Sequence, residues 1–354
     1  MWCTCSSAWG WSRSVTSERS PARKLLLAWR SMQRALVFVS LALAWLSATT
    51  RQARAEPRDL SEVQSDRYYY LHGGLAAAGF LGTAVEQILT SHHRPGYDLD
   101  AFGPDDSVRA NFSESSAHLS DKTLALSVTG PLLLQMSQGF STRMGNASLI
   151  YAEALSLNVL MASTAKIVVR RPRPYTHTKD PRLLDFMDRQ GADAYSSFYS
   201  GHASTSFTAA TAGSVLYSLQ TDELVARHTV WGVSFLLAGM TAQLRARAGR
   251  HYRTDIWVGS VMGVATGALV PALHRLDLQQ VRATELAVAG GALGVTMLLS
   301  EVVDFCAALD VLRLCGLPRD VDVPLRDASL VPRWKVLPQA YGGGGGLSVV
   351  GELL

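Results

Sequence analysis

Seven apolar segments of helical length, separated by polar loops, constrain the fold of this chain more than any other feature of its sequence. They are rich in Ala, Gly, Ser and Thr, and small residues let helices pack closely in or out of a bilayer. Several are uncharged over about the length of a membrane crossing, whereas the polar residues within others suit a soluble bundle as well. The sequence therefore predicts an all-α helical bundle. The expected helices lie near residues 70–90, 122–138, 147–170, 202–219, 229–244, 255–274 and 283–303.

The segment KIVVRRPRP, which starts at Lys166, gathers cations where a helix gives way to a loop. Lys166, Arg171 and Arg173 close an apolar stretch. Pro172 and Pro174 then prevent the helix from continuing. Cations grouped at a helix end can converge on an anion, although such a group alone is more often a solvated helix end or a membrane flank.

The segment YSGHAS, which starts at Tyr199, predicts the beginning of a helix that can hold phosphate. Ser200, Gly201 and His202 lead directly into a run of small residues, ASTSFTAATAGSVLYSL. The free N–H groups of a helix start favour an anion, Gly201 lets the backbone approach it closely, and Ser200 adds a hydroxyl donor. Alone, Ser-Gly-His is also a common turn.

The segment RARAGRHYRTD, which starts at Arg245, supplies a second histidine and a carboxylate. Gly249 interrupts the chain, and Thr254 and Asp255 open the next apolar helix. We expect His251 and Asp255 to lie one helical turn apart, so that the carboxylate holds one imidazole nitrogen as N–H and leaves the other as a nucleophile. Such a pair alone is usually a surface pair. The three segments together favour phosphoryl transfer through a histidine.

The order and spacing of these residues resemble the type 2 phosphatidic acid phosphatase (PAP2) and vanadium haloperoxidase superfamily over about residues 120 to 275. The family signature is Lys-x6-Arg-Pro, then Pro-Ser-Gly-His, then Ser-Arg-x5-His-x3-Asp. It matches at Lys166 with Arg173-Pro174, at Ser200-Gly201-His202, and at Arg245 with His251 and Asp255. The resemblance implies a helical bundle of this family's type.

The resemblance also implies a role for each matched residue. His251 would attack phosphorus and form a phosphohistidine, His202 would protonate the leaving group, and Asp255 would orient His251. The phosphate oxygens would be bound by Lys166, Arg173, Ser200, Gly201 and Arg245. Two positions depart from the signature, because Tyr199 stands where Pro is usual and Leu244 where Ser is usual. Neither residue carries the chemistry, so the departures bear on rate and substrate range more than on the reaction.

We therefore predict a metal-independent phosphatase, needing no cofactor, that hydrolyses a phosphomonoester or diphosphate, with a lipid phosphate as the expected class. Two alternatives remain at this point. One is a haloperoxidase, in which the same residues would hold vanadate; the other is a catalytically weak lipid-binding or scaffold protein. The net charge of +4 is too modest to imply nucleic acid. A phosphorylated substrate and a nearby membrane are the expected partners, and the sequence leaves the oligomeric state open.

The N-terminal residues predict export. Residues 1–31 match no foldable element, and Met32 is a candidate true start. From Met32, a basic start, an apolar core over residues 35–46 and an Ala53-Arg54-Ala55 cleavage pattern predict a secretory signal peptide that ends before Glu56. The alternative is an uncleaved membrane anchor. Export would place the protein in the bacterial cell envelope with its site on the periplasmic face.

The number of expected helices constrains how this bundle meets the membrane. Three expected helices between an exported Glu56 and Lys166 would put Lys166 in the cytoplasm if all of them crossed. A periplasmic site therefore requires that one of them does not span, or that the bundle is soluble or peripheral. Full membrane integration stays open.

The expected organisation has four parts: an extension and signal peptide over 1–55, an N-terminal helix and polar loop over 56–119, a phosphatase core over 120–303 and a tail over 304–354. In the tail, WKVLPQAYGGGGGLSVVGELL alternates around a glycine run, which predicts a short β-hairpin closing over the bundle, or else a flexible tail. In an exported protein, Cys306 and Cys315 would form a disulfide across a bend or remain buried thiols.

Overall fold

The structure is a computed structural model that describes residues 59–61, 74, 76–81, 103–109, 111–137, 139–177, 181–302, 333–341 and 344–352. The predicted signal peptide, the start at Met32 and the two cysteines Cys306 and Cys315 lie outside these residues. Of the helix predicted near 70–90, the described residues 74 and 76–81 are helical.

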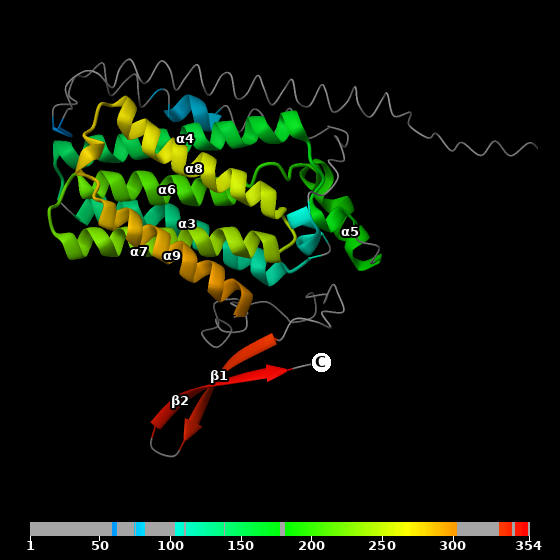
Figure 1. The fold of residues 1–354 in the computed structure, drawn as a ribbon. Helices are drawn as coiled ribbons and strands as arrows, with labels where there is room; N and C mark the ends of the chain where they lie inside the picture. The colour runs from blue at the N-terminus through cyan, green and yellow to red at the C-terminus, as the bar shows by residue number, and fades with distance from the viewer. Residues whose placement is uncertain are drawn as a thin grey trace, which may run out of the picture. The chain divides into compact units, whose positions relative to one another are not determined.

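Six long helices form the bundle in the described part of the chain, which confirms the all-α prediction (Figure 1). They alternate in direction, so the starts of α3, α6 and α8 lie at the same end of the bundle as the last residues of α4 and α7. The helices are α3 (Glu114–Ser137), α4 (Thr142–Val169), α6 (Gly201–Ser218), α7 (Leu224–Arg247), α8 (Arg253–Leu273) and α9 (Ala283–Val302).

Short helices complete the bundle at its ends. The segment between the first two motifs folds as η2 (Pro174–His177), α5 (Pro181–Gln190) and η3 (Gly191–Tyr195). Phe186 of α5 packs against the rings of Tyr175 and Phe112, with centroid distances of 5.4 and 5.0 Å, and this contact attaches the segment to the bundle. The remaining short helices are η1 (Gly103–Val108) and η4 (Leu278–Gln280).

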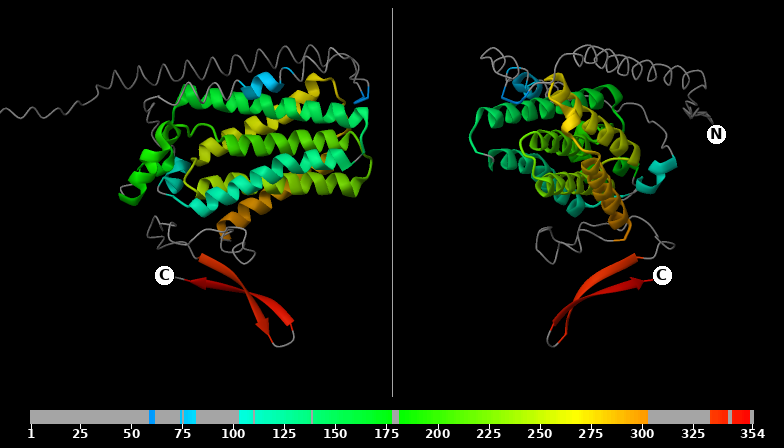
Figure 2. Two further views of the ribbon diagram at one scale, coloured as in Figure 1. Left: turned by 180° about the vertical axis from the view of Figure 1, so that it is seen from behind. Right: turned by 60° about the vertical axis from the view of Figure 1, so that its left-hand side comes forward.

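Helix α6 is the centre of the bundle and packs against α3, α4, α7 and α8 (Figures 1 and 2). Its Ala, Ser, Thr and Gly residues permit this, because small side chains let backbones approach closely. A Cβ atom at Gly263 of α8 would lie 2.3 Å from the Ser204 carbonyl oxygen, and one at Gly213 of α6 would lie 2.4 Å from Cβ of Pro131. Glycine at both positions therefore sets how closely α8 and α3 approach α6.

The ends of α4 show how local sequence fixes helix boundaries. At its start, the Ser141 hydroxyl accepts a hydrogen bond from the Met144 N–H at 3.2 Å. At its end, Arg170 adopts a left-handed conformation with φ 49°, and its N–H donates to the Lys166 carbonyl at 2.9 Å. The chain then turns at Pro172, so the first motif lies at the helix end that the prolines predict.

The C-terminal tail contains the predicted hairpin. Strand β1 (Arg333–Tyr341) pairs antiparallel with β2 (Gly344–Glu352), in a register that places Tyr341 opposite Gly344 and Arg333 opposite Glu352. The glycine-rich segment thus supplies the first residues of the second strand. That the hairpin closes over the bundle stays a prediction.

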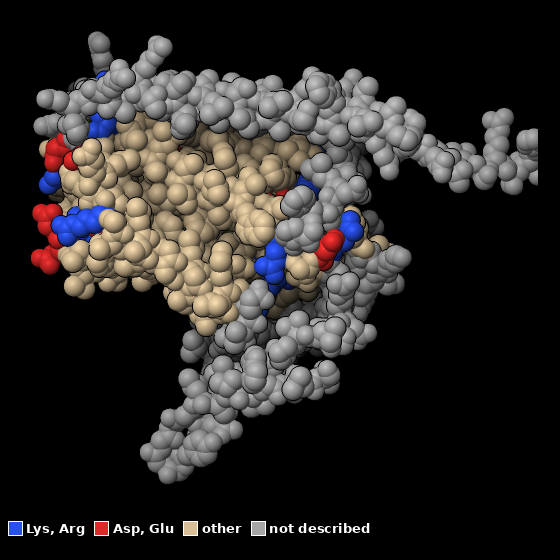
Figure 3. Space-filling model, in the orientation of Figure 1, with Lys and Arg blue, Asp and Glu red and all other residues tan. Residues whose placement is uncertain are grey.

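Three helical segments are long and apolar enough to cross a membrane: Thr142–His177, Arg253–Leu273 and Ala283–Ser300. Large apolar side chains are exposed on the outer faces, for example Leu133 of α3, Val261 of α8 and Leu298 of α9. Figure 3 shows Lys, Arg, Asp and Glu gathered toward the two ends of one face, with uncharged residues between them. This distribution supports membrane association.

Candidate functional site

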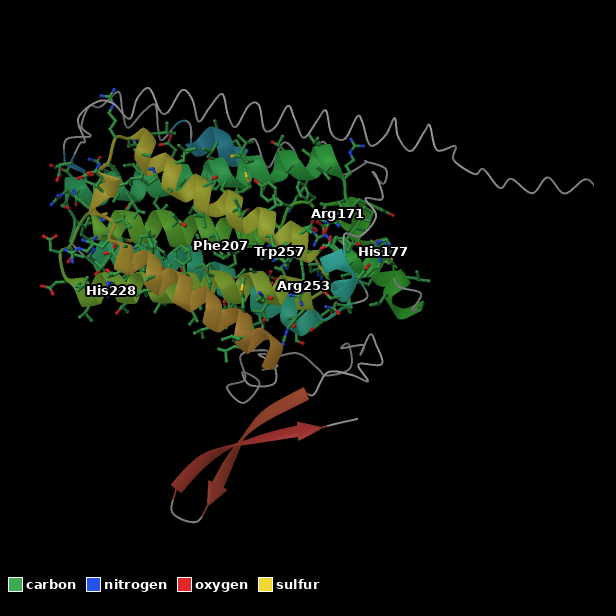
Figure 4. The ribbon with its side chains drawn as sticks, viewed as in Figure 1. Arg171, His177, Phe207, His228, Arg253 and Trp257 are labelled. Atoms are coloured by element: carbon green, nitrogen blue, oxygen red, sulfur yellow. The ribbon has the colours of Figure 1, made fainter. Side chains whose placement is uncertain are left out.

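The fold brings the three motifs together at one end of the bundle. The first motif follows the C-terminal end of α4, the second opens α6, and the third connects α7 to α8. Figure 4 shows Arg171 and Arg253 at this end, and His228 at the opposite end. Residues 79 positions apart, from Lys166 to Arg245, therefore contribute to one site, as their pattern predicts.

Lys166 faces the start of α6. A Cβ atom at Gly201 would lie 3.3 Å from the Lys166 Nζ atom, so glycine at position 201 is what leaves room beside the ammonium. In the described part of the chain, no side chain or carbonyl accepts a hydrogen bond from Nζ at the distances of a normal bond. The N–H of Gly201 opens the helix and has no partner within it. An ammonium and a helix start thus point to the same space.

The Ser200 hydroxyl caps a helix, whereas its motif predicts a hydrogen bond from this hydroxyl to phosphate. The hydroxyl caps α6 by accepting from the Ala203 N–H at 3.4 Å, and the Ser200 N–H donates to the Asp255 carbonyl at 3.0 Å. The side chain is fully buried. The neighbouring departure from the signature, Tyr199, is buried with Ala162 and Ala165 of α4. Leu244, the second departure, is fully buried as well.

Arg173 is held by the segment between the first two motifs. Its Nε donates to the Asp193 carbonyl oxygen at 2.8 Å, and its Nη2 to Asp193 Oδ1 at 2.6 Å. Although burial acts to raise the pKa of the Asp193 carboxyl, the neighbouring Arg173 and Lys166 hold it below its usual value. Asp193 therefore stays ionised and compensates one of the cations.

Arg245 reaches the site from the last turn of α7. Its Nη1 donates to Ser120 Oγ at 3.2 Å and lies 3.6 Å from Asp121 Oδ1, while its Nε, although buried, has no hydrogen-bond partner. Five residues later, the Arg250 guanidinium stacks over the rings of Phe186 and Tyr175. Burial first, and then the charge of Arg173, lower the pKa values of Lys166, Arg245 and Arg250, and the Asp193 carboxylate opposes this in each case.

Of the two histidines predicted for the site, His251 is the more enclosed. It is 1% exposed, and its Nδ1 lies 2.7 Å from the Ser197 carbonyl oxygen. Because a carbonyl only accepts, Nδ1 must carry the proton and Nε2 of the neutral ring is bare. Burial first, and then the cations Arg173 and Arg245, hold the pKa of His251 well below its ordinary 6.5. The ring is therefore neutral and offers a lone pair.

The structure corrects the expectation that Asp255 directly holds His251. Helix α8 begins at Arg253, so His251 lies in the preceding turn and is not one helical turn from Asp255. The Asp255 carboxylate instead accepts from Ser197 Oγ at 2.5 Å and from the Tyr252 N–H at 3.0 Å. Since the Ser197 carbonyl also accepts from the imidazole, Asp255 is linked to His251 through one intervening residue.

The Arg171 guanidinium binds two buried carboxylates, whereas the sequence groups Arg171 with the cations expected to bind an anion. Its Nη1 donates to Asp255 Oδ1 at 2.6 Å and its Nη2 to Asp105 Oδ2 at 2.8 Å. Asp105 of η1 also accepts from the Thr254 N–H at 3.0 Å. This buried network fixes the start of α8, and sequence spacing gave no signal for Asp105 or Ser197.

His202 lies in the first turn of α6 on the more open side of the site. Its Nε2 is 2.8 Å from Asp121 Oδ1, and its side chain is 28% exposed. Burial and the nearby Arg245 lower the pKa of His202 to about 4, and Asp121 opposes them. Asp121 was not identified from the sequence, because it lies in α3 at no distinctive spacing from the motifs.

The described residues contain no group of three or more His, Cys, Asp and Glu side chains that could hold a metal ion. The predicted absence of a cofactor stays a prediction. The same is true of vanadate binding, for which the residues would be the phosphate-binding set already described.

A model of the PAP2 superfamily matches residues 147–277. The match begins within α4, ends just after α8 and contains all three motifs. No curated protein and no solved structure matches the chain. The family suggests phosphatase activity. Residues 147–277, which contain the candidate site, are therefore similar to the PAP2 superfamily.

Proposed function

We propose that this protein is a phosphatase that hydrolyses a phosphomonoester or diphosphate through a phosphohistidine on His251. The observation that carries the proposal is a neutral, buried imidazole with a bare Nε2 beside an excess of positive charge. The cations are Lys166, Arg173, Arg245 and Arg250. Asp193 and Asp121 pair with Arg173 and Arg245, and Glu114 faces Arg250. The cations outnumber these carboxylates, and the remaining positive charge would attract a phosphate.

In the first step, His251 Nε2 attacks phosphorus and forms a P–N bond while the P–O bond to the leaving group breaks. The electron pair goes to the leaving oxygen, and His202 supplies its proton. In the second step, water attacks phosphorus, the P–N bond breaks, and His202 takes the proton from water. Lys166, Arg173 and Arg245 would stabilise the negative charge that spreads over the phosphoryl oxygens. No metal is needed to balance these steps.

We infer a lipid phosphate as the substrate class and the cell envelope as the location. Three helical segments of membrane-crossing length, and the uncharged middle of the face shown in Figure 3, support a lipid environment. The leader over Met32–Ala55 supports export. The candidate site lies at one end of the bundle, which suits a substrate whose phosphate head group is at the surface of a bilayer that holds its chains.

The nucleophile can be tested by trapping. Full-length protein in detergent is incubated with radiolabelled phosphate esters, including phosphatidate, a prenyl diphosphate and a soluble aryl phosphate. We expect acid-labile, base-stable label on wild type and none on His251→Ala, whose turnover falls by several orders of magnitude. His228→Ala, at the opposite end of the bundle, is the matched control and should behave as wild type. Normal turnover in His251→Ala would reject the assignment, and bromide oxidation with vanadate would favour the haloperoxidase.

A further inference from the structure

Asp121 contacts two residues that have different roles in the proposed reaction, the general acid His202 and the phosphate-binding Arg245. Its Oδ1 accepts from His202 Nε2 at 2.8 Å and lies 3.6 Å from Arg245 Nη1. It belongs to α3, before the residues that the family model matches. The side chains of Asp121 and His202 are 55% and 28% exposed, whereas His251 is 1% exposed. This pair therefore lies on the open side of the site, where a leaving group can depart.

The other charged groups around His202 oppose its protonation. Arg245 approaches from α7 and Lys166 from α4, and both lower the pKa of His202 in addition to burial. His251 faces it from the turn before α8. His118, one turn before Asp121 on α3, adds a further titratable group beside the carboxylate. Among the described residues, Asp121 is the carboxylate that stabilises a charged imidazole at position 202.

We propose that Asp121 is a positioning residue for His202, which it holds by the Nε2 hydrogen bond and whose protonated form it stabilises against the cations Arg245 and Lys166, so that a proton can pass to the leaving oxygen. This inference rests on the proposed function, in which His202 is the general acid. An imidazolium has two N–H groups, so the bond to Asp121 leaves the other for the leaving oxygen. The proton passes from His202 to that oxygen as the P–O bond breaks, and Asp121 remains ionised. When phosphate binds Arg245, Asp121 is left with His202 as its partner.

Asp121→Asn tests the charge with little change of shape, because the amide keeps one acceptor oxygen. The first readout is an NMR titration of the labelled histidine rings in full-length protein. We expect the pKa of His202 to fall by about one pH unit or more, since a nearby opposite charge shifts a pKa by about that amount. Asp106→Asn, an exposed carboxylate at the same end of the bundle, is the matched control and should leave that pKa unchanged.

The second readout is the dependence on leaving group. For an alkyl phosphate, whose leaving oxygen needs a proton, kcat at pH 7 should fall at least about tenfold in Asp121→Asn. For an activated aryl phosphate it should fall less than about threefold, because that leaving group needs little protonation. Asp121→Glu should restore part of the loss with alkyl substrates. A purely structural role would reduce turnover of both substrates equally.

The two readouts separate this inference from the proposed function. An unchanged His202 pKa in Asp121→Asn, or equal losses on alkyl and aryl substrates, would overturn the role of Asp121. If wild-type protein hydrolysed none of the phosphates, the proposed function would fail, and the NMR titration would still decide whether Asp121 controls His202.

Discussion

At the scale of single residues, we expect the role of Arg173 to depend on the planar shape of its guanidinium as well as on its charge. Two of its nitrogens bind Asp193 at once, one through the backbone carbonyl and one through the carboxylate. A lysine at this position would keep the charge and lose the fixed fork. We predict that Arg173→Lys lowers kcat about a hundredfold or more with a smaller change in KM, because the group acts mainly on transition-state charge.

Steady-state kinetics with one soluble and one lipid phosphate would measure this effect. Arg143→Lys is a suitable control, because Arg143 pairs with Asp59 on the surface at the other end of α4. The control should stay within about threefold of wild type, as expected for an exposed ion pair. Equal kcat in Arg173→Lys and wild type would show that a point charge is enough at position 173.

Buried histidines make the stability of the protein depend on pH. The pKa of His251 is held well below 6.5, and that of His202 is lowered to about 4. Below pH 6.5 the unfolded chain therefore binds protons that the folded protein does not. The free energy of unfolding should fall as pH falls from 6.5 toward 4, by up to about 1.4 kcal/mol per pH unit for each such histidine.

Chemical denaturation at pH 7, 6 and 5 would measure this slope. His251→Gln removes one of the titrating groups, so its stability should decline less steeply over the same range. An identical slope in wild type and His251→Gln would mean that His251 is protonated in the folded protein. That result would also contradict the assignment of a neutral nucleophile.

That the predicted site cations gather at one end of the bundle could be foreseen, because their spacing is fixed by helix ends, as with Lys166 and Arg173 around the end of α4. Their binding of an anion stays a prediction. The residues that hold these cations could not be foreseen. Asp105, Asp121 and Asp193 come from segments with no fixed sequence distance to the motifs, and Ser197 binds His251 through a backbone carbonyl. Every residue has a backbone carbonyl, so the sequence cannot indicate which carbonyl accepts a hydrogen bond. The indirect link between Asp255 and His251 is therefore visible only in the structure.

At the scale of secondary structure, the contact between α6 and α8 depends on a missing side chain. Gly263→Ala would bring Cβ to 2.3 Å from the Ser204 carbonyl oxygen, so one backbone must move. We predict a loss of about 1–3 kcal/mol in the free energy of unfolding. Because α6 also carries His202, activity should fall with it.

Gly290→Ala provides the matched comparison, since a Cβ there would meet nothing within 4 Å. Alanine favours a helix over glycine by up to about 1 kcal/mol, so this variant should be as stable as wild type or slightly more stable. Thermal or denaturant unfolding of both variants measures the difference. If Gly263→Ala were as stable as Gly290→Ala, the helices would not be in the close contact described.

The apolar periodicity of the sequence predicted these helices but placed the starts of two of them too late in the chain. Helix α3 begins at Glu114 and not near residue 122, and α7 at Leu224 and not near 229. In both cases the first turn is polar or exposed, so the apolar pattern starts later than the helix. The short helix α5 has no long apolar stripe, and the aromatic contact of Phe186 that attaches it depends on the tertiary fold.

At the scale of the whole molecule, the described residues nearest the predicted cleavage site lie at the end of the bundle opposite the candidate site. The Asn146 side chain donates to the Leu60 carbonyl at 2.5 Å, and Arg143 pairs with Asp59, both at the start of α4. A bundle that crossed a membrane in full would therefore place Leu60 and the site on opposite sides. The proposed periplasmic site requires incomplete crossing or peripheral attachment.

N-terminal sequencing and reporter fusions would decide between these arrangements. We predict that the purified protein begins at Glu56, and that fusions after Arg173 and after Asp255 both report the outside of the cytoplasm. A fusion after Gln220, at the other end of the bundle, should report the same side if the bundle is peripheral and the opposite side if it spans. Retention of Met32, or cytoplasmic reports from both site fusions, would refute export of the site.

Because α6 lies at the centre of the bundle, we expect substitutions in α6 to be tolerated less well than substitutions in the short helix α5. Nearly every side chain of α6 after its first turn is buried between four other helices, so almost any substitution there disturbs the start of the helix that faces the substrate. The segment from Tyr175 to Phe198 touches the same site through Asp193, Ser197 and the rings beneath Arg250, yet belongs to none of the six long helices. Because Asp193 and Ser197 hold Arg173 and His251, we expect substitutions in α5 of this segment, and not exchange of the whole segment, to change the substrate while the reaction is kept.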